Sequence, residues 1–538
     1  MLLVYNALII KHKQAFIGLL TASGILLAVY ICAGIIQYAR ISGTSFTELY
    51  DISGINGHKN LLSAMLFMLS SFLLTAIPFL KNRFTKAIPI AIYVISMTFV
   101  VLLKSRATLT GYMVSIMVFV IVLIFRKKQW VANRRWRLIF STLAIVISFV
   151  FFTLVLRQAT FSIVEENAQG THTEYDILSA SSMYERFALW NNTYQLSDEK
   201  PLLGCGLGNW KVEIQGVGTL NLYRCDMWNI NFVRPHNEFL GLLSECGYIT
   251  LLVYLIFICS LIVYAFFEIS KLKNIKDFIV GAVALAIFMG ANIIAVFDFP
   301  NERIEFIVWI NIIIAILYVI LSRNNTFRLN FRSNLLFVAL SIMLVIIGIY
   351  RYIGEYYTYD MQKAIRANDL QSTIKYSSKS ISSFYNIDPV GYPIHWYQGH
   401  AMLMRGDKRA KYALRKAYKN APYCKQNLND LGFVMYYEDH NLEAAEYYLR
   451  EAMRISPNFV NSGFNLVGIF MNEKEYNKAR MVLDLMYTDE AKRDMLLRDA
   501  EYFAPDNLEV ETRRIMYDYN TNIQLQHIVD SLRLQVVE

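Results

Sequence analysis

Long apolar runs that are almost free of charge constrain this chain more than any other feature of its 538 residues. Each run is long enough to cross roughly 30 Å of hydrocarbon as an α-helix. The connections between most of the runs are short and polar, and only 18% of the residues are charged. The sequence therefore predicts an all-α fold whose larger part is a polytopic membrane helical bundle. The nine predicted spans are residues 16–38, 61–80, 87–103, 107–125, 138–156, 239–267, 278–297, 304–322 and 334–350.

The distribution of basic residues indicates how these spans are oriented. If the N-terminus is cytoplasmic, the inner segments hold 17 basic residues and the short outer segments hold five. Such an excess is the usual signature of cytoplasmic loops. Residues 157–237, Arg106 and the domain after residue 350 then lie outside the cytoplasm. The net charge of +9 reflects orientation and attraction to anionic membrane lipids, and gives no support for nucleic-acid binding.

The soluble C-terminal part, residues 351–538, carries an internal repeat. Small and apolar residues recur with a displacement of 35 residues, and stacked helix pairs of about 34 residues pack in this way. A third copy follows, and residues 360–389 are a candidate degenerate first pair. The tyrosines 436, 437, 447 and 448 fit core packing better than ligand binding. The domain is predicted to present a concave surface to a protein partner or a protein acceptor. The repeated positions are Ala410, Leu414, Ala417 and Pro422, then Ala445, Leu449, Ala452 and Pro457, then Gly468, Tyr476, Ala479 and Leu483.

The six cysteines do not form a metal-binding pattern. Cys205 and Cys225 share the predicted outer loop, where disulfides are chemically permitted, so a bridge and two separate thiols are both compatible with the sequence. No C-x-x-C pair, H-E-x-x-H pattern or D-x-D cluster is present, and nothing predicts a bound metal or cofactor.

The segment Arg234-Pro235-His236-Asn237-Glu238 is the strongest candidate for chemistry. It ends the polar stretch and runs directly into the apolar span 239–267, in which we expect an interfacial turn before Tyr248. Ionisable groups at a membrane boundary are costly to keep and indicate function.

Arg106 lies between two predicted spans on the same outer side. Arg106 could be an arginine whose side chain extends to the membrane interface, or it could be a cation of the site. Its polar neighbours favour a cation of the site. His58, Lys59 and Asn60 precede the span 61–80 on this side as well. Asn60 is a plausible helix cap, whereas His58 and Lys59 could meet an anionic group.

Within the outer loop, residues 184–190 have helical apolar spacing and include Arg186. The glycine-rich stretch 201–210 follows. Its glycines superficially resemble a nucleotide-binding turn, but no strand–turn–helix unit surrounds them, so a tight turn is the better interpretation.

Arginines and one histidine on a single side suit a diphosphate at the membrane surface. Guanidinium groups bind phosphate oxygens and stabilise the charge on a diphosphate leaving group. A histidine can take the proton of an attacking hydroxyl. A donor of this kind needs no ATP.

Three stretches resemble the signature of the O-antigen ligase family: Arg186 to Trp190, Pro201 to Asn209, and Pro235 to Leu240 with the following Leu243, Glu245 and Gly247. Ser105-Arg106 and Gly57 to Asn60 are similar to two upstream motifs of that family. The resemblance covers roughly residues 50–320.

The resemblance implies a GT-C-like, metal-independent transferase in the bacterial inner membrane. It would move glycan from undecaprenyl diphosphate to an acceptor hydroxyl on the periplasmic face. By position, Arg106, Arg186 and Arg234 would bind the diphosphate and His236 would be the base, with His58, Lys59, Asn60, Asn237 and Glu238 as accessory residues.

The spans, their orientation and the repeats together predict four regions: membrane helices over 1–156, a periplasmic loop over 157–237, further membrane helices over 238–350 and a periplasmic domain similar to tetratricopeptide repeats over 351–538. The chain departs from the family in two features. It has nine predicted spans, whereas family members usually have about twelve. It also has a repeat domain, which is not part of the minimal form of the family.

Three activities of the family remain open: ligation to lipid A–core in lipopolysaccharide biosynthesis, which we favour, polymerisation of lipid-linked repeats, and transfer to serine or threonine of a protein. A lipid-sugar flippase or a membrane scaffold would be a different class. The clustering of cations on one face favours an enzyme over a flippase.

Overall fold

The computed structural model describes residues 13–40, 52–55, 57–126, 174–218, 231–322, 331–456 and 459–487. In these ranges the secondary structure is helical apart from two isolated β-bridges between residues 382 and 393. The chain divides into two compact units. The membrane unit comprises residues 1–190, 201–204 and 234–328, and the repeat unit comprises 191–200, 205–233 and 329–538.

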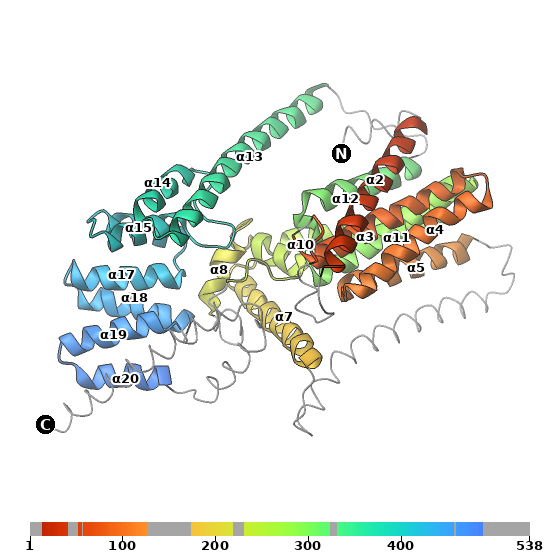
Figure 1. The fold of residues 1–538 in the computed structure, drawn as a ribbon. Helices are drawn as coiled ribbons and strands as arrows, with labels where there is room; N and C mark the ends of the chain where they lie inside the picture. The colour runs from red at the N-terminus through yellow and green to blue at the C-terminus, as the bar shows by residue number, and fades with distance from the viewer. Residues whose placement is uncertain are drawn as a thin grey trace, which may run out of the picture. The chain divides into compact units, whose positions relative to one another are not determined.

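Helices that are long and apolar enough to cross a membrane dominate the membrane unit (Figure 1). Eight such helices occur in the described ranges, one of which, α13, belongs to the repeat unit. The chain is therefore a multi-pass membrane protein, and the all-α prediction is confirmed. The fifth predicted span, 138–156, lies outside the described residues. The helices of the membrane unit are α2 (Lys13–Tyr38), α3 (Lys59–Leu73) extended by η2 (Leu74–Phe79), α4 (Arg83–Leu102), α5 (Arg106–Arg126), α10 (Glu238–Ser270), α11 (Ile275–Phe297), η3 (Pro300–Glu302) and α12 (Ile304–Leu321).

The core of this unit lies around α3 and α11, whose residues are buried along most of their length. Small residues let α11 approach α5 closely. A Cβ on Gly290 would lie 2.6 Å from the carbonyl oxygen of Gly111, so no larger residue fits there without separating the helices. Nearby, the buried hydroxyls of Ser70 and Tyr112 are 2.9 Å apart and hydrogen-bond to each other. The close packing holds the ends of the helices in a fixed arrangement.

A break inside α10 confirms the turn expected before Tyr248. Gly247 has φ +79° in the middle of the helix. A Cβ at this position would lie 2.1 Å from the carbonyl oxygen of Leu202, and one on Gly204 would lie 2.3 Å from the backbone of Glu245. The backbone N–H of Tyr248 donates to the carbonyl of Pro201 at 2.8 Å. The glycine-rich stretch therefore makes a tight turn whose backbone packs directly on the kink of α10.

The repeat unit is a stack of antiparallel helices (Figure 1). The end of α13 pairs with α14, and three further pairs follow. Ala410, Leu414 and Ala417 are fully buried, as are Ala445, Leu449 and Ala452, so the positions that recur in the sequence do form the core. The helices are α13 (Phe331–Arg366), α14 (Leu370–Ser380), α15 (Ile394–Met404), α16 (Ala410–Asn420), α17 (Lys425–Tyr437), α18 (Leu442–Ile455), α19 (Val460–Asn472) and α20 (Tyr476–Tyr487).

Two tyrosines of this unit differ from the expectation of core packing. Tyr437 and Tyr447 are 47% and 57% exposed, whereas Tyr436 and Tyr448 are partly buried against the repeat core. On these helices the apolar positions follow the buried alanines and leucines, so consecutive tyrosines point to different faces. Only one member of each tyrosine pair packs against the repeat core.

The boundaries of the two units differ from the predicted regions. Helix α13 continues without interruption through residue 350, where the soluble domain was expected to begin. The predicted loop 157–237 is divided, because residues 191–200 and 205–233 group with the repeats. Helix α7 (Glu174–Glu199) contributes to both units, and α8 (Trp210–Val217) belongs to the repeat unit.

Candidate active site

Four helices of the membrane unit begin at the end of the bundle that carries the candidate residues. Helices α3, α5, α10 and α12 start at residues 59, 106, 238 and 304, and α11 ends there at Phe297. A helix N-terminus presents unpaired N–H groups and a partial positive charge. This end of the bundle is therefore electrostatically suited to anions before any side-chain charge is counted.

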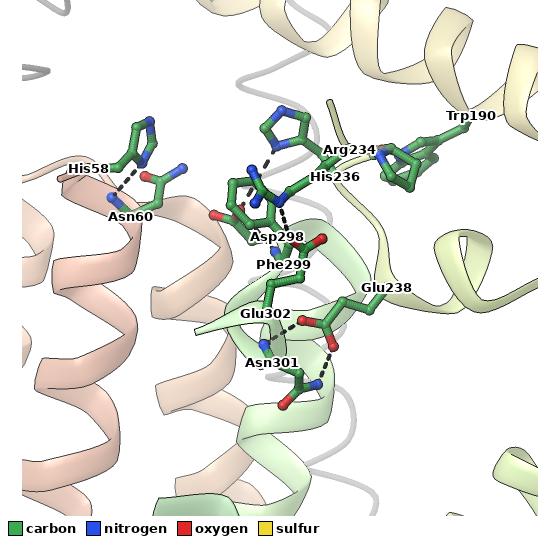
Figure 2. Close-up of polar contacts among 11 residues, drawn as sticks. His58, Asn60, Trp190, Arg234, His236, Glu238, Asp298, Phe299, Asn301 and Glu302 are labelled. Atoms are coloured by element: carbon green, nitrogen blue, oxygen red, sulfur yellow. Dashed lines mark hydrogen bonds and ion pairs between the residues drawn. The ribbon is translucent and has the colours of Figure 1, made fainter. Parts of the chain in front are cut away.

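The segment Arg234–Glu238 lies against the connection between α11 and α12 (Figure 2). The Nδ1 atom of His236 is 3.9 Å from Oδ1 of Asp298. The side chain of Arg234 forms an ion pair with Glu302. Glu238 accepts from the backbone N–H of Asn301 at 2.5 Å and also from its side-chain amide. The connection Asp298–Arg303 thus supplies a partner for each ionisable residue of the segment.

The backbone of the segment fixes His236 before α10 begins. Asn237 caps α10, since its side chain accepts from the N–H groups of Phe239 at 3.0 Å and Leu240 at 3.1 Å. His236 has φ +52°, in the left-handed region that non-glycine residues rarely adopt. Its ring lies against Phe299, with the ring centroids 5.0 Å apart, and its side chain is 28% exposed. The imidazole is held with one edge toward Asp298.

Asp298 is a buried carboxylate, 5% exposed, at the end of α11. Burial alone would raise its pKa, but the imidazole of His236 and the guanidinium of Arg186 lower the pKa below its ordinary value. Asp298 is consequently ionised at neutral pH. A carboxylate in this state stabilises positive charge on the neighbouring imidazole.

Arg186 reaches the same group of residues from α7. Its charge acts on both Asp298 and His58, which places the guanidinium near them. The helix is fastened to the segment by Trp190, whose Nε1–H donates to the carbonyl of Pro235 at 2.8 Å. The predicted helix around residues 184–190 is thus present, and it brings Arg186 toward His236.

His58 caps α3, and the suggestion that Asn60 does so is wrong. The Nδ1 atom of His58 accepts from the backbone N–H of Asn60 at 3.2 Å, which places Asn60 inside the first turn (Figure 2). Burial lowers the pKa of His58 to about 4, and the nearby Asp298 opposes this shift only in part. His58 is therefore neutral near pH 7, as its acceptor role requires.

Arg106 begins α5 after a turn in which Lys104 has φ +53°. Its charge acts on Lys59, which is buried and follows His58 in the sequence. Arg234 lies over the ring of Phe299 at 4.8 Å, next to Asp298. The centre of the site is therefore formed by His58, Arg186, His236 and Asp298. Arg234 lies beside this group, and Arg106 lies near Lys59.

Three site residues escaped the sequence analysis: Asp298, Asn301 and Glu302. The available signal was an acidic and amide-containing connection, Asp298-Phe299-Pro300-Asn301-Glu302, between two spans on the predicted outer side. A diphosphate is bound by cations, so the expected chemistry pointed to arginines and not to the carboxylates that pair with them. The proposed Cys205–Cys225 bridge stays a prediction, since Cys225 lies outside the described residues.

Comparison with known proteins gives this site a context. The sequence profile of the O-antigen ligase family matches residues 91–255. A protein of Rickettsia conorii, provisionally named a polysaccharide ligase, is 28% identical over 149 residues, which are 27% of this chain and 34% of that protein. The match thus spans about a third of the length of the relative. Residues 91–255 include Arg106, Arg186, Arg234 and His236, so the part of the chain that is similar to the O-antigen ligase family contains these four candidate site residues.

Proposed function

We propose that the membrane unit is a glycosyltransferase that moves glycan from undecaprenyl diphosphate to an acceptor hydroxyl, with lipid A–core of lipopolysaccharide as the favoured acceptor. One observation carries the proposal: His236 faces a buried, ionised Asp298 next to Arg186 and Arg234. A proton acceptor beside a set of fixed cations is what transfer from a diphosphate requires.

His236 acts as the general base in this proposal. With Nδ1 turned toward Asp298, Nε2 is the nitrogen that takes the proton of the acceptor hydroxyl. The hydroxyl oxygen then attacks the anomeric carbon of the glycan, and the bond from that carbon to the lipid diphosphate breaks. Asp298 stabilises the imidazolium that results, in the way that a buried carboxylate supports the histidine of a hydrolase triad.

The arginines act on the leaving group. When the glycosidic bond to the diphosphate breaks, negative charge grows on the departing oxygens, and guanidinium groups stabilise it. Arg186 and Arg234 lie beside His236, and the helix N-termini at this end of the bundle favour the same charge. Arg106 adds a further cation at the start of α5, and its charge acts on the buried Lys59 at the start of α3.

The distribution of basic residues supports a periplasmic site in the bacterial inner membrane. Lys59 and Arg106 begin helices on the side whose short loops are poor in lysine and arginine. Undecaprenyl diphosphate presents its head group at such a surface, and a compartment without ATP favours a donor that already contains an activated bond.

The test is His236→Ala in membranes supplied with an undecaprenyl-diphosphate-linked glycan and purified lipid A–core. We expect transfer to fall by about 10²- to 10⁴-fold, the usual contribution of a general base, while the protein level is unchanged. His440→Ala is a matched control, because His440 also has φ +52° but lies in a turn of the repeat unit.

Parallel reactions with a serine-containing peptide or a second lipid-linked glycan identify the acceptor. Product on lipid A–core supports ligation, and product only on the peptide or the glycan replaces that acceptor with a protein or a growing polymer. Normal transfer by His236→Ala would remove the base from the mechanism.

A further inference from the structure

The connection between α11 and α12 carries Asp298 and has to keep it next to His236. Helix α11 ends at Phe297 and α12 begins at Ile304, with the short turn η3 between them. Connecting segments are in general more mobile than the helices that they join. The distance between His236 and Asp298 therefore depends on the contacts that hold this connection in place.

Glu238 holds the connection at Asn301. Its Oε1 atom accepts from the backbone N–H of Asn301 at 2.5 Å, and its Oε2 atom accepts from the side-chain amide of the same residue (Figure 2). Two donors from one residue, one on each oxygen, fix the orientation of the carboxyl group as well as its distance. Both residues are partly buried, so water competes less for these hydrogen bonds.

Two contacts thus join the same two pieces of chain. On one piece, His236 and Glu238 lie on either side of Asn237, which caps α10. On the other piece, Asp298 faces His236, and Asn301 binds Glu238 three positions later. A single contact would let the two pieces pivot about it, whereas two contacts fix their relative orientation. Glu238 and Asn301 therefore support the pair formed by His236 and Asp298.

The backbone of the connection links Asn301 to the carboxylate of Asp298. Oδ1 of Asp298 accepts from the N–H of Phe299 at 3.0 Å. The N–H of Glu302 donates to the carbonyl of Phe299 at 3.3 Å, so Asn301 lies inside a hydrogen-bonded turn that begins next to Asp298. A shift of Asn301 would therefore also shift the carboxylate that faces His236.

We infer that Glu238 and Asn301 are positioning residues that set the distance between Asp298 and His236. The inference rests on the proposed function, in which His236 takes the proton of the acceptor hydroxyl and Asp298 stabilises the imidazolium. Neither Glu238 nor Asn301 has to touch the substrate in this role. Because a misplacement of about 1 Å can lower a rate about a hundredfold, the contact matters for the chemical step.

Glu238 also has a purely structural interpretation, which a matched variant separates from this role. It lies in the first turn of α10, where a carboxylate interacts favourably with the partial positive charge of the helix N-terminus. Asp277 lies in the first turn of α11, at the opposite end of that helix from Asp298. Asp277→Asn therefore removes a first-turn carboxylate and leaves the contact with Asn301 in place.

The first experiment reverses the direction of the side-chain hydrogen bond in the full-length protein. Glu238→Gln places an amide donor opposite the amide of Asn301. We expect kcat to fall about tenfold or more, with little change in the KM of donor and acceptor. In Glu238→Gln/Asn301→Asp the glutamine donates to the new carboxylate while its oxygen still accepts from the backbone, so most of the loss should be recovered. Asp277→Asn should retain the wild-type kcat.

The second experiment asks whether Glu238 acts through Asp298. In an Asp298→Asn background, Glu238→Gln should lower kcat less than about twofold, because the carboxylate that it positions is already absent. Equal fold-losses in the two backgrounds would show a general structural role and overturn the inference. A double variant Glu238→Gln/Asn301→Asp no better than Glu238→Gln would do the same.

The failure of the proposed function gives a different result from the failure of this inference. A wild type that transfers no glycan contradicts the proposed function and removes the role of Glu238 with it. An active wild type beside a fully active Glu238→Gln contradicts the positioning role alone. Melting temperatures in detergent test the contact without activity: Glu238→Gln should melt lower than the wild type, and adding Asn301→Asp should restore stability. A further loss of stability in the double variant would contradict the contact.

Discussion

The two units are built from the same kind of element but place their charges differently. In the membrane unit, ionisable groups gather at one end of the bundle and act on one another: His58, Arg186, His236 and Asp298. In the repeat unit, ion pairs such as Arg450–Glu446 and Arg454–Glu451 lie along exposed helix surfaces. Charges that share one buried environment can tune each other, whereas exposed pairs are screened by water. This difference supports placing the proposed chemistry in the membrane unit.

Asp298→Asn tests the interaction between Asp298 and His236 in the membrane unit, and we expect it to have the largest effect. The amide keeps the shape of the carboxylate but cannot balance an imidazolium, so kcat should fall about 10²- to 10⁴-fold. Because the pKa of Asp298 is lowered, its own protonation should not limit activity near neutral pH. Asp277→Asn, at the other end of α11, is the control and should transfer glycan normally. Full activity in Asp298→Asn would contradict the pairing with His236.

His58→Asn tests whether His58 is held in its neutral form in the folded chain, because such a histidine makes folding stability fall at acid pH. The folded chain favours neutral His58, so its contribution to stability is complete above about pH 6.5 and is lost as the pH falls toward 4. At pH 5 the loss should be about 1–2 kcal/mol. Asparagine retains the cap without titrating. The melting temperature of His58→Asn in detergent should fall less between pH 7.5 and 5 than that of the wild type; an equal fall in both would refute the assignment.

Glu302→Gln asks whether Arg234 is shared between its counter-ion and the diphosphate. Removing the carboxylate frees Arg234 from competition, while the ring of Phe299 still supports the guanidinium. A partly exposed pair contributes at most about 1 kcal/mol, so the KM of the donor should fall about three- to fivefold. Steady-state kinetics measure this, with Glu268→Gln as a control next to Lys271. A higher KM would mean that Glu302 mainly orients Arg234.

Arg450→Ala should have the smallest effect. Its pair with Glu446 spans one turn of α18, and the Arg450 side chain is 48% exposed. Such pairs contribute about 0.3–0.5 kcal/mol. The melting temperature should therefore change little and glycan transfer should stay at the wild-type level. A large loss of transfer would show that the exposed charges of the repeats bind a substrate or partner, and the contrast between the units would need revision.

More of the fold than of the candidate site could be predicted from the sequence. Apolar length and the recurring alanines sufficed for the spans and the repeat core, because both depend on patterns local to one or two helices. Gly247 was placed correctly as a turn for the same reason. The partners of the site depend on which helix ends meet, and no local pattern predicts that Arg234 faces Glu302 or that His236 faces Asp298. The sequence likewise could not predict how residues 191–233 are divided between the two units, because the division results from long-range packing.

The backbone at His236 links catalysis to the cost of folding. A non-glycine residue at φ +52° gives up free energy, of order 1 kcal/mol, that glycine would not lose. Glycine at this position would relax the backbone and leave the site without an imidazole. In the proposed function, stability and activity therefore make opposite demands on this one residue, and selection for stability alone would favour a variant without the proposed base.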